Sequence, residues 1–393
     1  MKKFLILLSC LLVLSPIYIK AEEVENETSE NQISLAQNAK SAILIDASTG
    51  QVLFEKNSHE KLAPASMTKI MSMLVIVESI EKGIIHWDDM VTASSNASGM
   101  GGSQILLETG EQMKVEDMFK GVAVASGNDA VVALAEAVAG TTDEFVKMMN
   151  QKVKELGLKD TNFKNPHGLD EANHYSSAYD MAMIARELVK YEKVLTFTSI
   201  YEDYLRKGTS KEFWLVNTNK LVRFYNGVDG LKTGYTKEAG YCLTATAKKN
   251  DLRLISVVMG EETNGLRSSE TSSILDYGFA QYKSTELVKK GDVVAEVEVE
   301  KAKKQTVSVI TKENASILMK KTEKMGEITY EPQIDKIKAP VKVGDKVGIL
   351  NVKEDGKLVK QVDLTVKEDI KEANILELYI RYLSDLAVGN IKF

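Results

Sequence analysis

The stretch KLAPASMTKIMSMLVIVE, residues 61–78, predicts a turn followed by a helix that enters the core of the protein. The turn ends at Pro64, and the helix is expected to begin at about Ser66. Apolar side chains then recur at the spacing of an α-helix, at Ile70, Met73, Leu74 and Ile76. The surrounding domain is therefore expected to be organised around this helix.

The first turn of this helix carries a serine and a lysine three residues apart, Ser66 and Lys69. This spacing places both side chains on one face of the helix. A serine hydroxyl becomes a good nucleophile when a base accepts its proton, and a lysine amine can do so if burial keeps it neutral. The pattern is weak by itself, because Ser58 and Lys61 have the same spacing and a serine before a helix is often only a cap.

The composition is that of an ordinary globular protein. With 393 residues, of which 44% are hydrophobic and 27% charged, the chain is long enough for two or three domains. The formal net charge is −6. Proteins that bind nucleic acid usually carry an excess of basic residues, so no nucleic-acid partner is expected.

The N-terminus has the features of a secretory signal peptide, with two lysines followed by an apolar run that Pro16 interrupts. We expect residues 1–21 to form this signal peptide, with cleavage after Ala21. A retained anchor helix and a lipoprotein cleavage site at Cys10 are alternatives that the short, interrupted run disfavours. Cleavage would leave Cys242 as the single cysteine, without a disulfide partner. We therefore expect export to a bacterial cell envelope, either to the outer face of the cytoplasmic membrane or as a secreted protein.

The beginning of the mature chain predicts a leader, a hairpin and a loop region. Residues 22–37 are acidic and polar without an apolar period, which is typical of a flexible leader. Apolar runs at 42–45 and 52–54 flank Ser48-Thr49-Gly50, which indicates a β-hairpin. Residues 84–112 are rich in glycine and serine and are expected to be mostly loops.

Helical and strand periods follow in two blocks. Helical patterns occupy residues 115–126, 127–140, 142–157 and 176–191, with caps or glycines at their ends. Strand-like runs at 241–247 and 252–259 come next, followed by a helix expected at 266–282. A strand from the start of the domain would pair with the second block. We therefore expect an α/β domain, a sheet with a helical insert, over residues 38–285.

The C-terminal part of the chain predicts a different architecture. Valines alternate with lysines and glutamates between glycine and aspartate turns, which indicates a small all-β domain over residues 286–368. Residues 369–393 then predict an amphipathic helix. Its apolar face carries Ile375, Leu376, Tyr379, Tyr382, Leu383 and Leu386. This helix could make peripheral contact with a membrane surface or pack on the β domain, and its few basic residues weaken attraction to anionic lipid.

Two further motifs add weight to the Ser66 pattern. Ser126-Gly127-Asn128 forms a polar turn between two apolar segments. Lys232-Thr233-Gly234 comes shortly before an apolar strand, where a hydroxyl, an ammonium and a glycine would let an anionic substrate lie close to the backbone. Each motif is weak alone, because Asn128 could merely cap a helix and Lys232 could be a solvated strand end.

Together and in this order, Ser66-x-x-Lys69, Ser126-x-Asn128 and Lys232-Thr233-Gly234 resemble the motif set of the penicillin-recognising serine acyltransferases. The segments at 167–170 (HGLD), 175–182, 227–243 and 253–260 look like those of the low-molecular-mass D-alanyl-D-alanine carboxypeptidases. So does the order of signal peptide, catalytic domain, β domain and amphipathic tail. The resemblance implies a penicillin-binding-protein/β-lactamase-like transpeptidase fold for the α/β domain.

The resemblance also implies roles for individual residues. Ser66 would be the nucleophile, Lys69 its base, and Ser126 would take part in proton transfer. The residues implied in binding the substrate are Asn128, Lys232, Thr233, Gly234, Tyr235 and Arg267. The implied reaction removes the terminal D-alanine from a peptidoglycan stem peptide through an acyl-enzyme, uses no metal or cofactor, and is inhibited by β-lactams.

Several alternatives remain at this point. A β-lactamase is disfavoured, because no Glu-x-x-Leu-Asn loop is evident and the β domain is additional. A D,D-endopeptidase shares the same motifs, and a non-catalytic scaffold that binds penicillin would keep them. A triad base at His167 is disfavoured, since the family's HGLD segment is structural. Residues 99–103, near the mouth of the implied site, could change substrate access.

Overall fold

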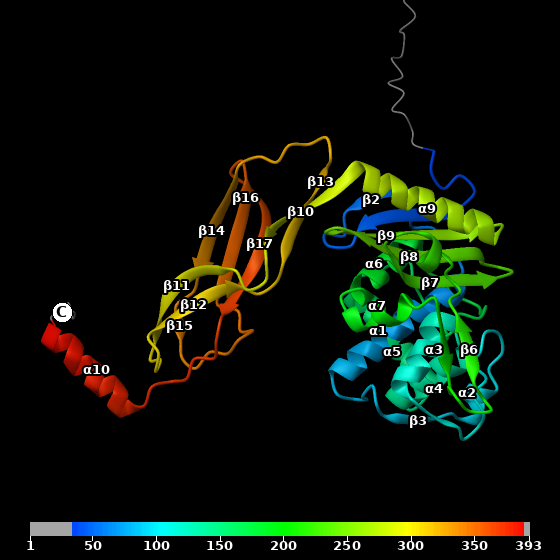
Figure 1. Ribbon diagram of the computed structural model, residues 1–393, viewed down its shortest axis with the longest axis horizontal. Coiled ribbons are helices and arrows are strands. Elements are labelled where there is room, and N and C mark those ends of the chain that lie inside the picture. The colour runs from blue at the N-terminus through cyan, green and yellow to red at the C-terminus, as the bar shows by residue number, and fades with distance from the viewer. Residues whose placement is uncertain (1–33, 389–393) are drawn as a thin grey trace, which may run out of the picture. The chain divides into compact units, whose positions relative to one another are not determined.

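The computed structural model of the protein describes residues 34–388 (Figure 1). The predicted signal peptide, residues 1–21, lies outside the described residues, as does the larger part of the predicted leader. The described chain contains an α/β domain followed by a β-rich domain and a C-terminal helix. This architecture confirms the predicted fold class.

The α/β domain is built on a five-stranded sheet with the strand order β2-β1-β9-β8-β7. All neighbouring strands in it are antiparallel. The strands are β1 (Ser41–Asp46), β2 (Val52–Lys56), β7 (Val228–Thr236), β8 (Gly240–Lys249) and β9 (Leu252–Glu261). The N-terminal hairpin β1–β2 therefore joins the C-terminal hairpin β8–β9, as the sequence predicted.

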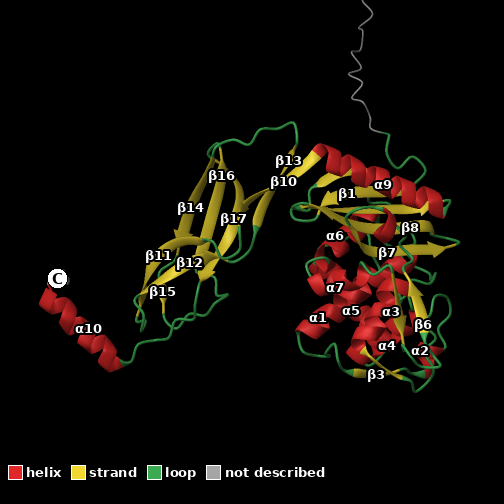
Figure 2. Cartoon of the chain, viewed as in Figure 1, coloured by secondary structure: helices red, strands yellow, loops and turns green. Residues whose placement is uncertain are grey.

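Both faces of this sheet are covered by helices (Figure 2). In β1, Ile43 packs into the larger core, which includes α1 (Lys69–Glu81), whereas Leu44 packs into a second core with α9 (Asn264–Gln281). Successive side chains of a strand point to opposite faces, so a strand buried on both faces must be apolar throughout. This explains why residues 42–45 in the middle of β1 are a continuous apolar run.

The helical insert follows the predicted pattern. The predicted helices are α3 (Val115–Ala125), α4 (Asn128–Ala139), α5 (Thr142–Glu155) and α6 (Ala178–Leu188). The sequence did not predict two short helices, α7 (Glu192–Thr198) and α8 (Leu221–Phe224), or the hairpin of β5 (Glu202–Leu205) and β6 (Phe213–Val216). The loop-rich region contains β3 (Met90–Thr92), α2 (Ser95–Ser98) and β4 (Gln112–Lys114). These elements are too short for an apolar periodicity to be recognised in the sequence.

The Lys232-Thr233-Gly234 motif lies inside β7, which pairs with β8 and forms an edge of the sheet. The apolar strand expected shortly after the motif is β8, but the sequence did not predict β7 as a separate strand. Lysine, threonine and two glycines dilute the apolar signal of this strand, so its strand character is hidden in the sequence.

The ordered domain begins earlier than residue 38. Ala36, at the end of the predicted flexible leader, has only 2% of its surface exposed. The Lys56 ammonium donates to the carbonyls of Ala36 and Gln37, and Glu270 on α9 accepts from the backbone of Asn38. Hydrogen bonds from distant residues, which a local polar pattern does not reveal, fix this segment.

The β-rich domain contains a six-stranded sheet with the order β14-β16-β17-β12-β11-β15. Its strands are β11 (Val293–Glu300), β12 (Thr306–Thr311), β14 (Ile328–Ile334), β15 (Ile337–Lys338), β16 (Gly348–Glu354) and β17 (Lys357–Val366). A separate pair is formed by β10 (Tyr282–Val288) and β13 (Ala315–Lys320). The predicted boundary between residues 285 and 286 thus falls inside a strand.

The C-terminal helix α10 (Ile375–Val388) lies within the predicted segment 369–393, but the first residues of that segment belong to the β domain. Ile370 pairs with Val341, and both Ile370 and Ala373 are buried. Within residues 34–388, every helix is too short or too polar to cross a bilayer.

Candidate active site

Ser66 and Lys69 lie together at the start of the central helix. Ser66 belongs to a short 3₁₀ turn, Ala65–Thr68, that leads directly into α1. Lys69 Nζ donates to Ser66 Oγ at 3.0 Å, and the lysine side chain is fully buried. Ala65, next to the serine, has a φ of +47°, which is uncommon for a residue other than glycine. The predicted serine–lysine pair is therefore assembled in the folded protein.

Lys69 is held from a second side by the HGLD segment. Its Nζ donates to the carbonyl oxygen of His167 at 2.6 Å. Burial lowers the pKa of Lys69 well below its ordinary value, and the nearby charge of Lys232 lowers it further, whereas Asp129 acts in the opposite direction. Two acceptors thus orient a lysine whose environment favours the neutral amine.

The His167 ring is not arranged as a base for Ser66. Burial lowers the pKa of this histidine to about 3, so the ring is a weak base. Its Nδ1 accepts a hydrogen bond from the backbone N–H of Leu169 at 3.2 Å. His167 contributes its backbone carbonyl to the site, a contact with Lys69 that the residue type alone does not indicate.

Gly168 allows the HGLD segment to pass close to the serine. It has a φ of +88°, and a Cβ at this position would lie 1.9 Å from the carbonyl oxygen of Ala65. We expect Gly168→Ala to lower the free energy of unfolding by about 2 kcal/mol or more, because the clash is with backbone and cannot be relieved by a rotamer change. Urea denaturation measures this loss.

Gly157→Ala is the matched control for Gly168→Ala. Gly157 also has a positive φ, +69°, but a Cβ there would meet nothing within 4 Å. Gly157→Ala should therefore lower the free energy of unfolding only by the strain of a positive φ, about 1 kcal/mol. Equal losses for the two variants would contradict the steric explanation.

The Ser126-Gly127-Asn128 turn joins α3 to α4. Ser126 ends α3 in the left-handed conformation, with a φ of +66°, and Asn128 begins α4. Ser126 Oγ and Asn128 Oδ1 are buried and have no hydrogen-bond partner among the described residues. Because buried polar atoms are normally paired, two unpaired groups in one turn indicate a place where a ligand supplies the partner.

The edge strand β7 contributes a second buried lysine. Lys232 is 1% exposed, and burial together with the charge of Arg267 lowers its pKa to about 7. The Thr233 hydroxyl donates to Thr218 Oγ1 at 2.7 Å. Gly234 has a packing role, since a Cβ there would lie 2.7 Å from the carbonyl oxygen of Pro64. A side chain at this position would push β7 away from the turn that carries Ser66.

These groups surround one pocket of about 430 Å³. The predicted site residues in its wall are Ser66, Ser126, Thr233, Gly234, Tyr235 and Arg267. The other three, Lys69, Asn128 and Lys232, are buried to 2% exposure or less and do not line it. The structure therefore places six of the nine predicted residues at the surface of the pocket and three in the buried layer behind it.

Sequence reasoning missed several residues of the pocket wall. Ser103, Thr218 and Asn264 also line it, and Asn264 Oδ1 accepts from the Arg267 guanidinium at 2.5 Å. Arg267 Nε is buried without a partner among the described residues. Thr218 and Asn264 belong to no recognisable motif, so the sequence carried no signal for them. Ser103 is the last residue of segment 99–103, which was expected to affect substrate access to the site.

Comparison with protein families gives two matches along the chain. Residues 25–263 match Peptidase S11, described as D-alanyl-D-alanine carboxypeptidase. Residues 282–372 match the penicillin-binding protein 5 C-terminal domain. The first match covers the α/β domain up to β9 and ends just before α9, and the second covers the β-rich domain.

Curated proteins and solved structures agree with these matches. The chain is 52% identical over 366 residues to D-alanyl-D-alanine carboxypeptidase DacF of Bacillus subtilis, covering 93% of each chain. It is 36% identical over 354 residues to DacA of Escherichia coli, covering 88% of this chain and 87% of that one. The structure of penicillin binding protein 5 from Haemophilus influenzae is similar with a TM-score of 0.66 and 34% identity, covering 85% of this chain and 98% of that one.

Proposed function

Because the chain belongs to the D-alanyl-D-alanine carboxypeptidase family, Peptidase S11, we propose that it is a serine-type D,D-carboxypeptidase with Ser66 as its nucleophile. The observation that carries the assignment of the nucleophile is the 3.0 Å hydrogen bond between Ser66 Oγ and the buried Lys69 Nζ. The substrate is a peptidoglycan stem peptide that ends in D-alanyl-D-alanine.

In the proposed reaction, Ser66 Oγ attacks the carbonyl carbon between the two terminal D-alanines while Lys69 accepts the hydroxyl proton. The neutral amine needed for this step is favoured by burial and by the charge of Lys232. Ser126 and Lys232 pass a proton to the nitrogen of the departing D-alanine. Asn128 binds the substrate amide. The backbone N–H groups of Ser66 and Tyr235 stabilise the developing oxyanion.

The terminal carboxylate of the substrate would be bound on the side of the pocket formed by β7 and α9. The Thr233 hydroxyl and the Arg267 guanidinium both line the pocket and suit a carboxylate, to which arginine binds strongly. In this structure the Thr233 hydroxyl donates to Thr218 Oγ1 at 2.7 Å, and its proton would turn to the carboxylate when the substrate binds. This arrangement favours a substrate with a free C-terminus.

Water then hydrolyses the ester at Ser66, which restores the enzyme. A β-lactam would acylate the same serine, but its leaving group stays attached to the acyl group and can block the approach of water. The family's penicillin-binding names agree with this expectation. We therefore propose β-lactams as covalent inhibitors.

The direct test is release of free D-alanine from diacetyl-Lys-D-Ala-D-Ala by purified protein that begins at residue 22. Release, together with covalent labelling by benzylpenicillin, would support a carboxypeptidase. Labelling without release would overturn the carboxypeptidase assignment and direct the search to cross-linked muropeptides or to a scaffold role. If folded protein showed neither labelling nor release, the proposed nucleophile would be overturned as well.

We also propose that the protein is exported to the cell envelope and that α10 binds a membrane surface. The exposed fractions of the apolar side chains on this helix are 87% for Ile375, 66% for Leu376, 59% for Tyr379, 58% for Ile380 and 46% for Leu383. Such a face is suited to the boundary between lipid headgroups and acyl chains. Figure 1 shows α10 as the last described element of the chain.

Sedimentation with lipid vesicles tests this part of the proposal. Because α10 carries Glu377 and Asp385 against a single Arg381, its binding should come from apolar burial and should depend little on salt. We expect the chain 22–393 to sediment with neutral vesicles and the double variant Ile375→Glu/Ile380→Glu to remain in solution. Equal sedimentation of both proteins would argue against this surface.

A further inference from the structure

The loop between α2 and β4 forms part of the wall of the site, and Asn128 holds it at two points. The Asn128 side-chain N–H donates to the carbonyl of Gly101 at 2.7 Å, and its backbone N–H donates to the carbonyl of Ser103, also at 2.7 Å. Ser103 lines the same pocket as Ser66. The position of this loop is therefore coupled to the orientation of the Asn128 amide.

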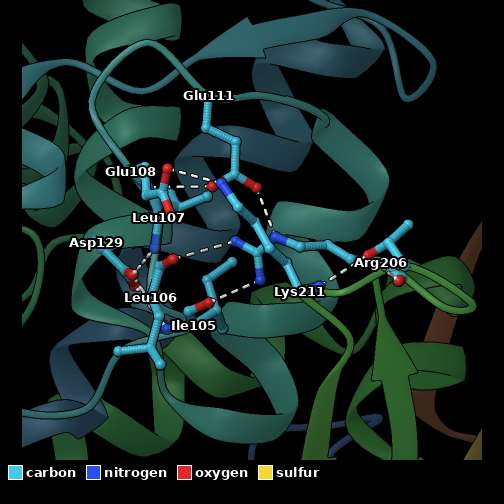
Figure 3. Close-up of polar contacts among 9 residues, drawn as sticks. Ile105, Leu106, Leu107, Glu108, Glu111, Asp129, Arg206 and Lys211 are labelled. Atoms are coloured by element: carbon cyan, nitrogen blue, oxygen red, sulfur yellow. Dashed lines mark hydrogen bonds and ion pairs between the residues drawn. The ribbon is translucent and has the colours of Figure 1, made fainter.

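The next residue, Asp129, holds the following part of the loop. Its carboxylate, 1% exposed, accepts from the backbone N–H of Ile105 at 3.0 Å and from that of Leu107 at 3.0 Å (Figure 3). Asn128 and Asp129 together bind four backbone groups of the loop. The first turn of α4 thus fixes the loop from the inner side.

Arg206 fixes the same loop from the other side. Its guanidinium donates to the carbonyl of Ile105 at 3.0 Å and to that of Leu106 at 3.4 Å, and Nε pairs with Glu111 at 2.5 Å. Arg206 follows β5 directly, so these bonds tie the loop to the β5–β6 hairpin. In Figure 3 the arginine lies between Glu111 and the loop backbone.

The loop conformation needs such restraint. Leu106 has a φ of +58° and is 60% exposed, so this strained residue gains little from packing. Its neighbour Ile105 is fully buried against two glycines. A Cβ at Gly121 or Gly127 would lie 2.8 Å or 3.2 Å from Ile105 Cγ2. The Ile105 side chain therefore fits in one position between these glycines. The hydrogen bonds from Arg206 to the Ile105 and Leu106 carbonyls hold the loop backbone in the matching position.

We propose that Arg206 is a positioning residue for the reaction, because it holds the loop in the place where the carbonyl of Gly101 orients the Asn128 amide. With its NH₂ group bound to Gly101, the Asn128 amide leaves Oδ1 buried behind the pocket wall without a partner among the described residues. A substrate that enters the site would bring its amide N–H to this atom. Arg206 does not line the pocket and acts through the loop. This inference rests on the proposed function.

Arg206→Met tests the inference, with Lys211→Met as the matched control. Lys211 pairs with Glu108 of the same loop at 2.7 Å, but both side chains are more than half exposed. We expect Arg206→Met to lower the rate of acylation by benzylpenicillin, and kcat for the peptide, by about 10- to 100-fold, since small misplacements of binding groups have effects of this size. KM should change less than about threefold, and Lys211→Met should leave both rates unchanged.

Arg206→Lys separates positioning from stability. A lysine can pair with Glu111 but cannot also reach two carbonyls, so it should restore thermal stability and leave acylation slow. If Arg206→Met fails to fold, the acylation rate of Arg206→Lys tests the positioning role in its place. Wild-type rates in folded Arg206→Met or Arg206→Lys would overturn the inference and leave the proposed function intact. A wild-type protein that neither releases D-alanine nor binds penicillin would instead refute the proposed function.

Discussion

Ser66→Ala is expected to lower D-alanine release from diacetyl-Lys-D-Ala-D-Ala by about a thousandfold or more and to abolish labelling by benzylpenicillin. Without Oγ no acyl-enzyme can form, and the remaining groups of the pocket can only bind and polarise the substrate. The folded state should change little, since within residues 34–388 Ser66 Oγ accepts one hydrogen bond, from Lys69 Nζ. Mass spectrometry of the penicillin-treated protein and a D-alanine assay measure both effects.

Ser58→Ala is the matched control for Ser66→Ala. Ser58 has the same spacing to Lys61 as Ser66 has to Lys69, but it lies outside the pocket and donates to Glu55 at 2.5 Å. Its replacement should cost about 1 kcal/mol of stability and leave activity unchanged. Activity in Ser66→Ala that equals that of Ser58→Ala would contradict the proposed nucleophile.

The difference between these two serines shows what the sequence could predict. Each serine–lysine pair has helical spacing, but only Ser66 is followed by the run of Ile70, Met73 and Leu74, and all three are fully buried. Apolar periodicity therefore indicated which pair enters the core. The other predicted helices and the strands β1, β8 and β9 follow from the same kind of pattern, because burial of one or both faces fixes the period.

What the sequence could not predict depends on backbone groups and on contacts between distant residues. The second partner of Lys69 is the carbonyl of His167, which any residue could supply. Thr218 contacts Thr233, 15 positions further along the chain, and Arg206 contacts Ile105, about a hundred positions earlier. Both residues lie in a region without long periodic elements. The motif residues of β7 were found, but their strand was not, because the close approach to Pro64 requires glycine where a strand normally carries larger side chains.

The two buried lysines make the pH dependence of acylation a test of their roles. The pKa of Lys69 is lowered well below its ordinary value, and that of Lys232 is lowered to about 7. If Lys69 must be neutral and Lys232 charged, kcat/KM should rise with pH as Lys69 loses its proton. It should fall again above about pH 7, as Lys232 loses its own. The pH profile of kcat/KM reports these groups in the free enzyme.

Lys69→Arg is expected to lower acylation by about a hundred- to ten-thousandfold, the range that loss of a general base produces. A guanidinium remains protonated in proteins, so it cannot accept the proton of Ser66 at any pH of the assay. The residual kcat/KM should therefore show no rise from acid pH. Stopped-flow acylation by a chromogenic β-lactam between pH 5 and pH 9 measures rate and profile together.

Lys61→Arg is the control for this substitution, since Lys61 is exposed and pairs with Asp160 at the surface. It should preserve both the rate and the pH profile. Thermal unfolding must show that Lys69→Arg is folded, because a larger cation replaces a buried lysine. A folded Lys69→Arg protein that keeps the rise from acid pH would mean that another group titrates there. Lys232 would then be the first residue to test, because burial and the charge of Arg267 lower its pKa to about 7.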